Sequence, residues 1–79
     1  MAVVSLTQMQ QGKSGKIIEI QGGRDLTTRL EALGLRPGVQ IEKIGSQFIR
    51  GPVMVRIGRT QVAIGFKMAG KVLVEERDE

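Results

Sequence analysis

The clearest pattern of apolar residues along the chain has the spacing of a helix. Leu26, Leu30 and Leu33 fall at i, i+4 and i+7, which places the three leucines on one helical face. We expect this face to be buried. Gly34 then stands where a left-handed residue commonly ends a helix, so that Leu35 is expected to pack against Leu30. The pattern therefore predicts one well-defined helix, which stops at Leu33.

Residues with strong turn preferences bracket this helix. Asp25 is the expected N-cap, because its carboxylate can accept a hydrogen bond from a free N–H group of the first turn. Pro37 disfavours helical dihedrals at Arg36, and Pro37 with Gly38 suits the two central positions of a type II turn. The chain is therefore expected to reverse direction there and to enter a strand.

Alternation with a period of two predicts five short strands. They are residues 16–21, 39–44, 52–57, 60–64 and 71–76. The first strand contains three isoleucines within four positions, which suggests a bulge or a twist. In the second strand, Val39, Ile41 and Lys43 share one face. Residues 5–9 and 66–70 are each expected to form a single helical turn.

Five short strands separated by glycine turns, with one real helix between the first and the second, indicate a mainly β fold. We expect a small five-stranded SH3-like barrel with short helical turns. A chain of 79 residues is expected to form a single domain, residues 1–79. Residues 75–79 contain four acids and Arg77, and we expect them to form a frayed tail.

The composition argues against most kinds of chemistry. The chain has no cysteine and no histidine, which removes thiolate ligands, the usual general base and the commonest metal ligand. The carboxylates outside the tail are scattered rather than spaced as a ligand set. We therefore expect no catalytic residue, no cofactor and no metal site. The chain also lacks a long apolar run, so that a cytoplasmic protein is expected.

One segment resembles a phosphate-binding loop. Residues 65–71 match the first seven positions of the P-loop pattern, but Val72 stands where serine or threonine should hold magnesium. A P-loop must also open a helix, whereas the residues that follow have the pattern of a strand. We therefore expect a turn between two strands at this position.

Charge is distributed unevenly along the chain. Residues 1–74 carry 11 basic and 4 acidic residues, a net charge of +7, whereas residues 75–79 carry one basic and four acidic residues, a net charge of −3. Residues 43–71 contain six basic residues and no acid, which indicates a positive half of the domain. This half could bind an acidic partner, or could simply keep the domain in solution. Nucleic acid is an alternative ligand, although Phe48 and Phe66 are the only aromatic residues available for stacking on bases.

Several short motifs are shared with a known family. The most specific is R-L-E-A-L-G-L-R-P-G at residues 29–38. The others are Leu6 with Gly12, the isoleucine strand at 17–20, Gly22-Gly23, G-P-V-M-V at 51–55, and V-A-I at 62–64 before Ala69. On these motifs nearly the whole chain resembles the FeoA family, the small SH3-like accessory proteins of a ferrous-iron transporter that carries a GTPase domain. The chain is also similar to the C-terminal domain of iron-dependent repressors, without their DNA-binding and dimerisation helices.

The resemblance implies a non-enzymatic regulatory protein that binds the cytoplasmic, GTPase-bearing part of the transporter and modulates ferrous-iron uptake. Bound iron is not needed for this role. Our hypothesis for the docking surface combines the predicted helix with the loop after the second strand, through Leu26, Arg29, Leu30, Leu33, Phe48, Ile49 and Arg50. Phe48 and Ile49 could equally fold back into the core. We expect a monomer or a weak homo-oligomer. The alternative function, a basic SH3-like barrel that binds nucleic acid, predicts a much steeper dependence on salt.

Overall fold

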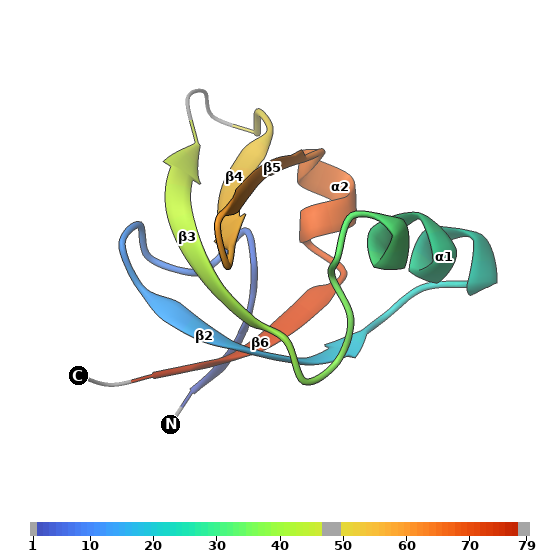
Figure 1. Ribbon diagram of the computed structural model, residues 1–79, viewed down its shortest axis with the longest axis horizontal. Helices are drawn as coiled ribbons and strands as arrows, with labels where there is room; N and C mark the ends of the chain where they lie inside the picture. Colours follow the sequence, from blue (N-terminus) through green and yellow to red (C-terminus); the bar gives the residue numbers. More distant parts are fainter. Residues whose placement is uncertain (1, 47–49, 78–79) are drawn as a thin grey trace.

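The computed structural model describes residues 2–46 and 50–77 of the chain. These residues form six strands and two helices (Figure 1). The strands are β1 (Val3–Ser5), β2 (Ser14–Ile20), β3 (Gln40–Ser46), β4 (Val53–Ile57), β5 (Thr60–Ile64) and β6 (Val72–Glu76). The helices are α1 (Arg24–Ala32), between β2 and β3, and α2 (Phe66–Ala69), between β5 and β6.

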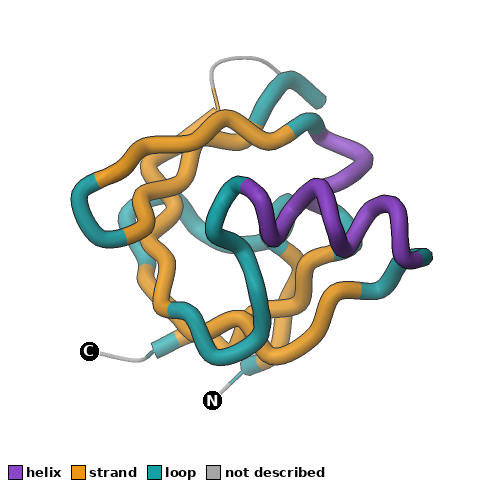
Figure 2. Tube along the Cα trace, turned by 45° about the vertical axis from the view of Figure 1, so that its right-hand side comes forward, coloured by secondary structure: helices purple, strands orange, loops and turns teal. Residues whose placement is uncertain are grey.

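All six strands belong to one antiparallel sheet with the order β1-β6-β2-β3-β4-β5. The sheet curls strongly, and β2 and β6 cross below the upright β3, β4 and β5 (Figure 1). Figure 2 shows the same curl from a second direction, with α1 lying outside the strands. The predicted mainly β, SH3-like fold is confirmed, and β1 and β5 form the two edges of the sheet.

The core is built by alternation along the strands. The described side chains that are fully buried and apolar come from four strands, from α1 and the residues after it, from α2 and from the segment after β1: Leu6, Ile17, Leu30, Leu35, Val53, Val55, Ile64, Ala69, Val72 and Val74. Successive residues of a strand point to opposite faces, so that Met54 and Arg56 lie on the outer face of β4. The inward positions predicted for β4, β5 and β6 are confirmed, with Ile57 and Val62 partly buried against the core.

The sequence predicted five strands, whereas six are present among the described residues. The additional strand is β1, in which Val3 pairs with Glu75 of β6. Three residues are too few for a period of two to be recognised, and this strand forms because β6 offers it a hydrogen-bonding edge. β6 itself continues through Glu76, which pairs with Gly15 of β2, so the first residues of the acidic tail belong to the sheet.

A β-bulge interrupts the pairing of β2 with β6, as the three isoleucines suggested. The register shifts between Ile17 and Glu19, so that Ile18 has no place in the regular alternation. Ile17 is consequently buried in the core, while 40% of the Ile18 surface is exposed. The bulge therefore allows Ile17 and Ile20, which are three positions apart, both to pack against the core.

The N-terminus of α1 differs from the prediction. Gly23 is the N-cap, with extended backbone (φ −73°, ψ 178°), and Asp25 lies in the first turn of the helix rather than at its cap. The chain turns into the helix at Gly22-Gly23, so the helix starts at Arg24. A Cβ atom at Gly22 would overlap the Leu26 side chain, so the turn depends on glycine there. Asp25 still stabilises this end, since a carboxylate in the first turn interacts favourably with the helix dipole.

The C-terminus of α1 and the turn that follows are as predicted. The Leu35 N–H donates to the Leu30 carbonyl and the Gly34 N–H to the Glu31 carbonyl, both at 2.9 Å, which is the hydrogen-bond pattern of a Schellman motif. Gly34 has a φ of +94°, and Leu30 and Leu35 are both fully buried. Four residues further on, Gly38 has a φ of +95°, as the third residue of a type II turn requires. Local sequence therefore directs the chain from α1 into β3.

Candidate partner-binding surface

Helix α1 lies beside the barrel and is held to it mainly from its C-terminal half. Leu30 is fully buried in the core, and Leu35, one residue past the helix end, is buried beside it. Leu26 is partly buried and covers the Gly22 backbone. Most of the rest of the helix surface, which includes Arg29 and Glu31, is exposed. The barrel thus fixes the orientation of α1 and leaves a side of it accessible to a partner.

The structure corrects the prediction that all three leucines of the helix are buried. Leu33 is 42% exposed, because it is the C-cap residue and the backbone leaves the helix immediately after it. Arg29 is also exposed and lies four positions earlier on the same helix surface. Leu30, in contrast, has no exposed area, so it cannot touch a partner and can only hold α1 in position. Of the helix residues proposed for docking, Arg29 and Leu33 are therefore the accessible pair.

The other half of the predicted docking surface is the loop between β3 and β4. Phe48 and Ile49 lie outside the residues that the structure describes, and their role stays a prediction. Arg50 is exposed and has a φ of +61°, in the left-handed region that residues other than glycine seldom adopt. Arg50 lies in the connection that leads into β4, and the β4–β5 hairpin stands between the start of β4 and α1 (Figure 1).

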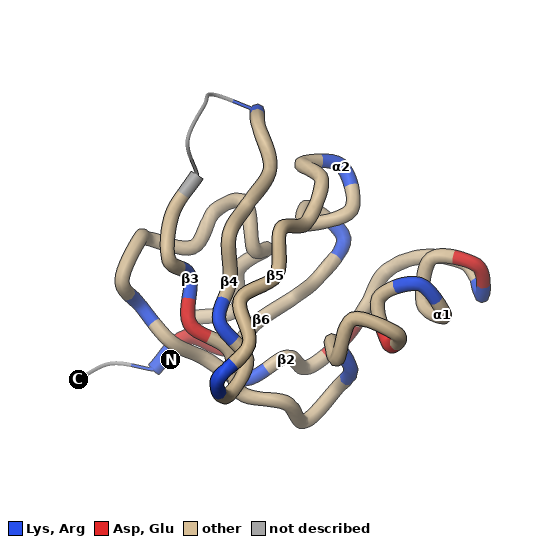
Figure 3. Tube along the Cα trace, turned by 45° about the horizontal axis from the view of Figure 1, so that its top comes forward, with Lys and Arg blue, Asp and Glu red and all other residues tan. Residues whose placement is uncertain are grey.

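The six basic residues at positions 43–71, which indicated a positive half of the domain, do not all add free positive charge to its surface. Lys43 is buried, and Arg56 pairs with Glu42 across β3 and β4, with a distance of 3.1 Å between Nη1 and Oε1. Of the six basic residues at positions 43–71, those that remain exposed and are not paired in this way are Arg50, Arg59, Lys67 and Lys71. Figure 3 shows basic positions at separate places around the barrel. This arrangement does not favour the nucleic-acid alternative, since backbone recognition uses a groove lined by positive charge.

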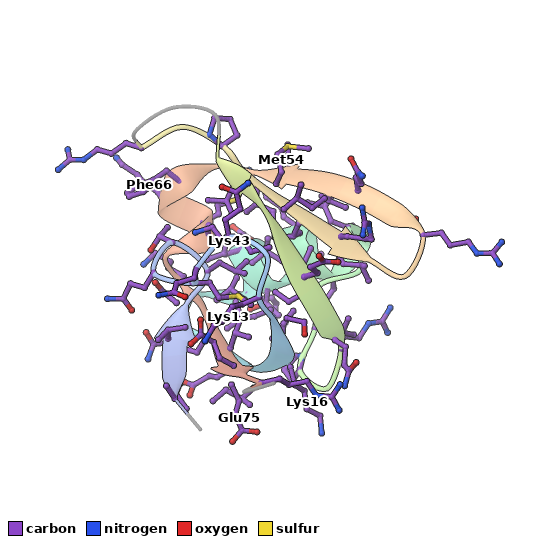
Figure 4. All side chains as sticks on the ribbon, turned by 90° about the vertical axis from the view of Figure 1, so that its left-hand side faces the viewer. Lys13, Lys16, Lys43, Met54, Phe66 and Glu75 are labelled. Carbon is purple, nitrogen blue, oxygen red and sulfur yellow. The ribbon has the colours of Figure 1, made fainter. Side chains whose placement is uncertain are left out.

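Lys43 binds the segment between β1 and β2 to β3, a role that the sequence analysis missed. Its Nζ atom donates to the Met9 carbonyl at 2.7 Å and to the Thr7 carbonyl at 3.3 Å, and 6% of the residue is exposed. Figure 4 shows the Lys43 side chain directed into the molecule. The strand pattern contained the signal, because Lys43 shares a face with Val39 and Ile41. Its charge, in contrast, suggested a position on the surface.

Replacing Lys43 with methionine is expected to change how the free energy of unfolding depends on pH. Burial removes water from the ammonium group and lowers the pKa of Lys43 from its ordinary value of 10.5. Below the lowered pKa both the folded and the unfolded chain are charged, and the cost of burying the charge is present in full. As the pH rises from the lowered pKa to 10.5, the unfolded chain binds more protons, so the stability contributed by Lys43 increases.

Urea unfolding followed by circular dichroism measures this effect, because the chain has no tryptophan or tyrosine for fluorescence. Relative to Lys43→Met, the wild type should gain free energy of unfolding as the pH rises towards 10.5. Lys67→Met is the matched control for removing a lysine charge, since Lys67 is exposed on α2. A difference that does not change with pH for Lys43→Met would contradict the desolvation of Lys43.

Metal and phosphate chemistry find no support in the described residues. No group of three or more acidic, histidine or cysteine side chains in residues 2–46 and 50–77 is placed to hold a metal ion. The segment that resembles a P-loop contains α2, which has four residues, and continues directly into β6. It is a connection between two strands, as expected. Within the same described residues, no helix combines the length and the apolar character needed to span a membrane.

Comparison with known proteins connects this fold to one family. The family model of the FeoA domain matches residues 4–76. Among solved structures, the crystal structure of an iron uptake regulatory protein (FeoA) is 34% identical, with a TM-score of 0.88, covering 98% of this chain and 100% of the other. The solution structure of a FeoA-like protein from Clostridium acetobutylicum is 19% identical, with a TM-score of 0.86, covering 100% and 92%. No curated protein matches the chain.

The same fold occurs inside larger proteins. A manganese-dependent transcriptional repressor is 16% identical, with a TM-score of 0.83, over 91% of this chain. The match covers 40% of the repressor, so this chain corresponds to less than half of that protein. At this identity the likeness shows the fold alone.

Proposed function

Because this chain belongs to the FeoA domain family and so has a role in ferrous iron transport, we propose that it binds the cytoplasmic, GTPase-bearing part of the membrane ferrous-iron transporter. The observation that carries the proposal is the match of the FeoA domain to residues 4–76, nearly the whole chain. The FeoA domain is a small accessory domain, so we expect this chain to act through contacts with its partner rather than as an enzyme.

The accessible end of α1 supports a role in docking. Arg29 and Leu33 are four positions apart and form one exposed surface that combines a guanidinium group with an apolar side chain. Arginine is enriched among the residues that contribute most to protein interfaces. The Schellman ending and the buried Leu30 hold this surface in a defined orientation, which lowers the entropic cost of binding.

Regulation follows from a difference in affinity. If the domain binds one state of the GTPase-bearing region more tightly than another, it shifts the transporter towards that state. The size of the shift cannot exceed the ratio of the two affinities. This mechanism needs no iron on the accessory protein.

The proposal is tested by titrating the ¹⁵N-labelled chain with the GTPase-bearing cytoplasmic domain of the transporter and, separately, with generic RNA. We expect saturable chemical-shift changes around Arg29 and Leu33 with the protein domain, at low and at physiological salt. An RNA complex would instead weaken steeply with salt, because phosphate binding releases counterions. Shift changes with RNA alone would contradict the proposal.

Replacing Leu33 with glutamine is expected to weaken binding to this domain by roughly tenfold or more, which corresponds to the loss of one main contact of an interface. Isothermal titration calorimetry measures the dissociation constant. Val3→Gln is the matched control, because Val3 is 51% exposed and lies on β1, away from α1. Equal affinity of both variants would exclude the end of α1 as the docking surface, but it would not contradict the proposed partner.

A further inference from the structure

Strand β5 is an open edge of the sheet. It is the last strand in the order β1-β6-β2-β3-β4-β5, and its recorded pairing is with β4. Thr60, Gln61 and Ala63 are exposed, and Val62 is partly buried against the core. The inner face of β5 is thus fixed by the barrel while its outer edge faces solvent.

The pairing register shows which backbone groups point away from the sheet. Ile57 and Thr60 face each other across a two-residue turn, so they form the first hydrogen-bonded pair of the hairpin. Such pairs alternate along an antiparallel ladder, which directs the N–H and C=O groups of Gln61 and Ala63 away from β4. No backbone hydrogen bond outside the ladder engages either residue in the described part of the chain. β5 therefore presents two donors and two acceptors in the spacing of a strand.

This edge lacks the features that usually prevent a further strand from pairing. Natural edge strands are commonly protected by charged side chains, proline, bulges or very short length. The five residues of β5, T-Q-V-A-I, contain no charge and no proline, and their register with β4 is regular. The other edge strand, β1, has three residues. β5 is thus the edge that can accept an added strand.

The charges around β5 indicate which kind of chain could pair with it as an added strand. Arg59 precedes the strand and Lys67 follows it on α2, both exposed, and residues 43–74 contain no acid. Figure 3 shows basic positions on β4, in the turn before β5 and on α2. On the outer face beside the edge, Met54 is the register partner of Ala63, and both are apolar. Figure 4 shows Met54 on the outer side of the sheet. An acidic chain with alternating apolar residues complements these features.

We propose that an extended acidic segment of the protein partner adds to β5 as a seventh strand, with its backbone on Gln61 and Ala63 and its carboxylates near Arg59 and Lys67. The proposal rests on the proposed function for the identity of the partner. It predicts a second region of contact with the partner, in addition to the end of α1. When a peptide adds to a sheet edge as a strand, backbone hydrogen bonds supply much of the affinity, and the side chains that alternate along the added strand supply specificity.

Amide hydrogen exchange of the full chain tests the proposal directly. Two probes are used: a capped peptide that alternates glutamate with valine, and the GTPase-bearing cytoplasmic domain of the transporter. With each probe near saturation, we expect the Gln61 and Ala63 amides to exchange at least about tenfold more slowly, because each gains a hydrogen bond. A matched peptide with lysine in place of glutamate should give no protection, since Arg59 and Lys67 repel it.

Ala63→Pro removes one of the donors without touching the ladder, and proline is tolerated at such an edge position. We expect it to weaken binding of the acidic peptide by about tenfold. The melting temperature of this variant is compared with that of the wild type to check that the variant folds. If the variant does not fold, Arg59→Gln is used instead, which leaves the β5 backbone unchanged and should also weaken the acidic peptide. Val3→Gln, on β1, is the control for both.

The outcomes separate this proposal from the proposed function. If the GTPase-bearing domain binds but the Gln61 and Ala63 amides remain unprotected, the strand proposal is wrong and the proposed function stands. If the acidic peptide protects these amides while the domain does not bind, the edge is confirmed as a docking site and the proposed partner is wrong. Protection that appears at high protein concentration without any probe would assign the edge to a second copy of this chain and overturn the proposal.

Discussion

Replacing Leu30 with alanine is expected to remove a large share of the stability of this domain. Leu30 is fully buried, and burial of a leucine in a core that cannot collapse around the cavity makes its truncation cost about 2–5 kcal/mol. A domain of 79 residues has a total stability of about 4–12 kcal/mol. Leu30 also closes the Schellman ending of α1 through its contact with Leu35, so that the helix should lose its attachment to the barrel.

Urea unfolding followed by circular dichroism gives the size of the loss. Leu33→Ala is the matched control in the same helix, because Leu33 is partly exposed and its truncation should cost far less than that of Leu30. In a variant that still folds, ¹⁵N relaxation of the α1 amides should report faster motion than in the wild type. Equal losses for the two variants would mean that α1 is not anchored by Leu30.

Replacing Gly15 with alanine is expected to disturb the contact between β2 and β6. A Cβ atom at this position would lie 2.5 Å from Val74 Cγ1 and 2.6 Å from the backbone oxygen of Glu75. The oxygen belongs to the paired strand and cannot rotate away, so that β2 and β6 must move apart. Overpacking of this kind costs typically about 1–3 kcal/mol, and here it acts on strands at the centre of the sheet.

The measurement is again the free energy of unfolding, together with the amide exchange rates of β6. Gly23→Ser is the control substitution, because a Cβ atom at Gly23 meets nothing within 4 Å and serine is a favourable N-cap. We expect Gly23→Ser to be neutral or slightly stabilising. A Gly15→Ala variant as stable as the wild type would show that β2 and β6 can separate at little cost.

Mutations of the proposed docking residues and mutations of the core should have different effects. Variants of Leu33, Ala63 or Arg59 alter exposed groups and should change binding with little effect on stability. Variants of Leu30 or Gly15 act on the core and the sheet, and they should impair binding only as far as they unfold the domain. Binding and unfolding measured on the same variants therefore separate a contact from a supporting residue.

Much of the local structure could be predicted because short-range physical chemistry determines it. The end of α1 depends on the backbone preferences of Gly34, and the turn before β3 depends on Pro37 and Gly38. The regular alternation in β4 and β5 was sufficient to locate both strands and their buried faces. Each of these features involves residues that are at most a few positions apart.

The accessible surface could not be predicted in the same way. Lys43 counts as a surface charge in the sequence, yet its ammonium group reaches the carbonyls of Thr7 and Met9, 36 and 34 positions away. Leu33 has the helical spacing of a buried residue but is exposed, because the barrel contacts α1 through Leu30. The free edge of β5 depends on which strands pair, and the sequence alone does not give the strand order.

By itself, then, the sequence determined the SH3-like class, the family, the main helix with its ending and the inward face of most strands, because these follow from dihedral preferences and from the period of apolar residues. Only the tertiary structure decided that β1 joins β6, that Lys43 is buried, and that Arg29, Leu33 and the edge of β5 remain available to a partner. The physical reason is that burial and strand order depend on contacts between distant segments, and such contacts exist only after the chain has closed into a barrel.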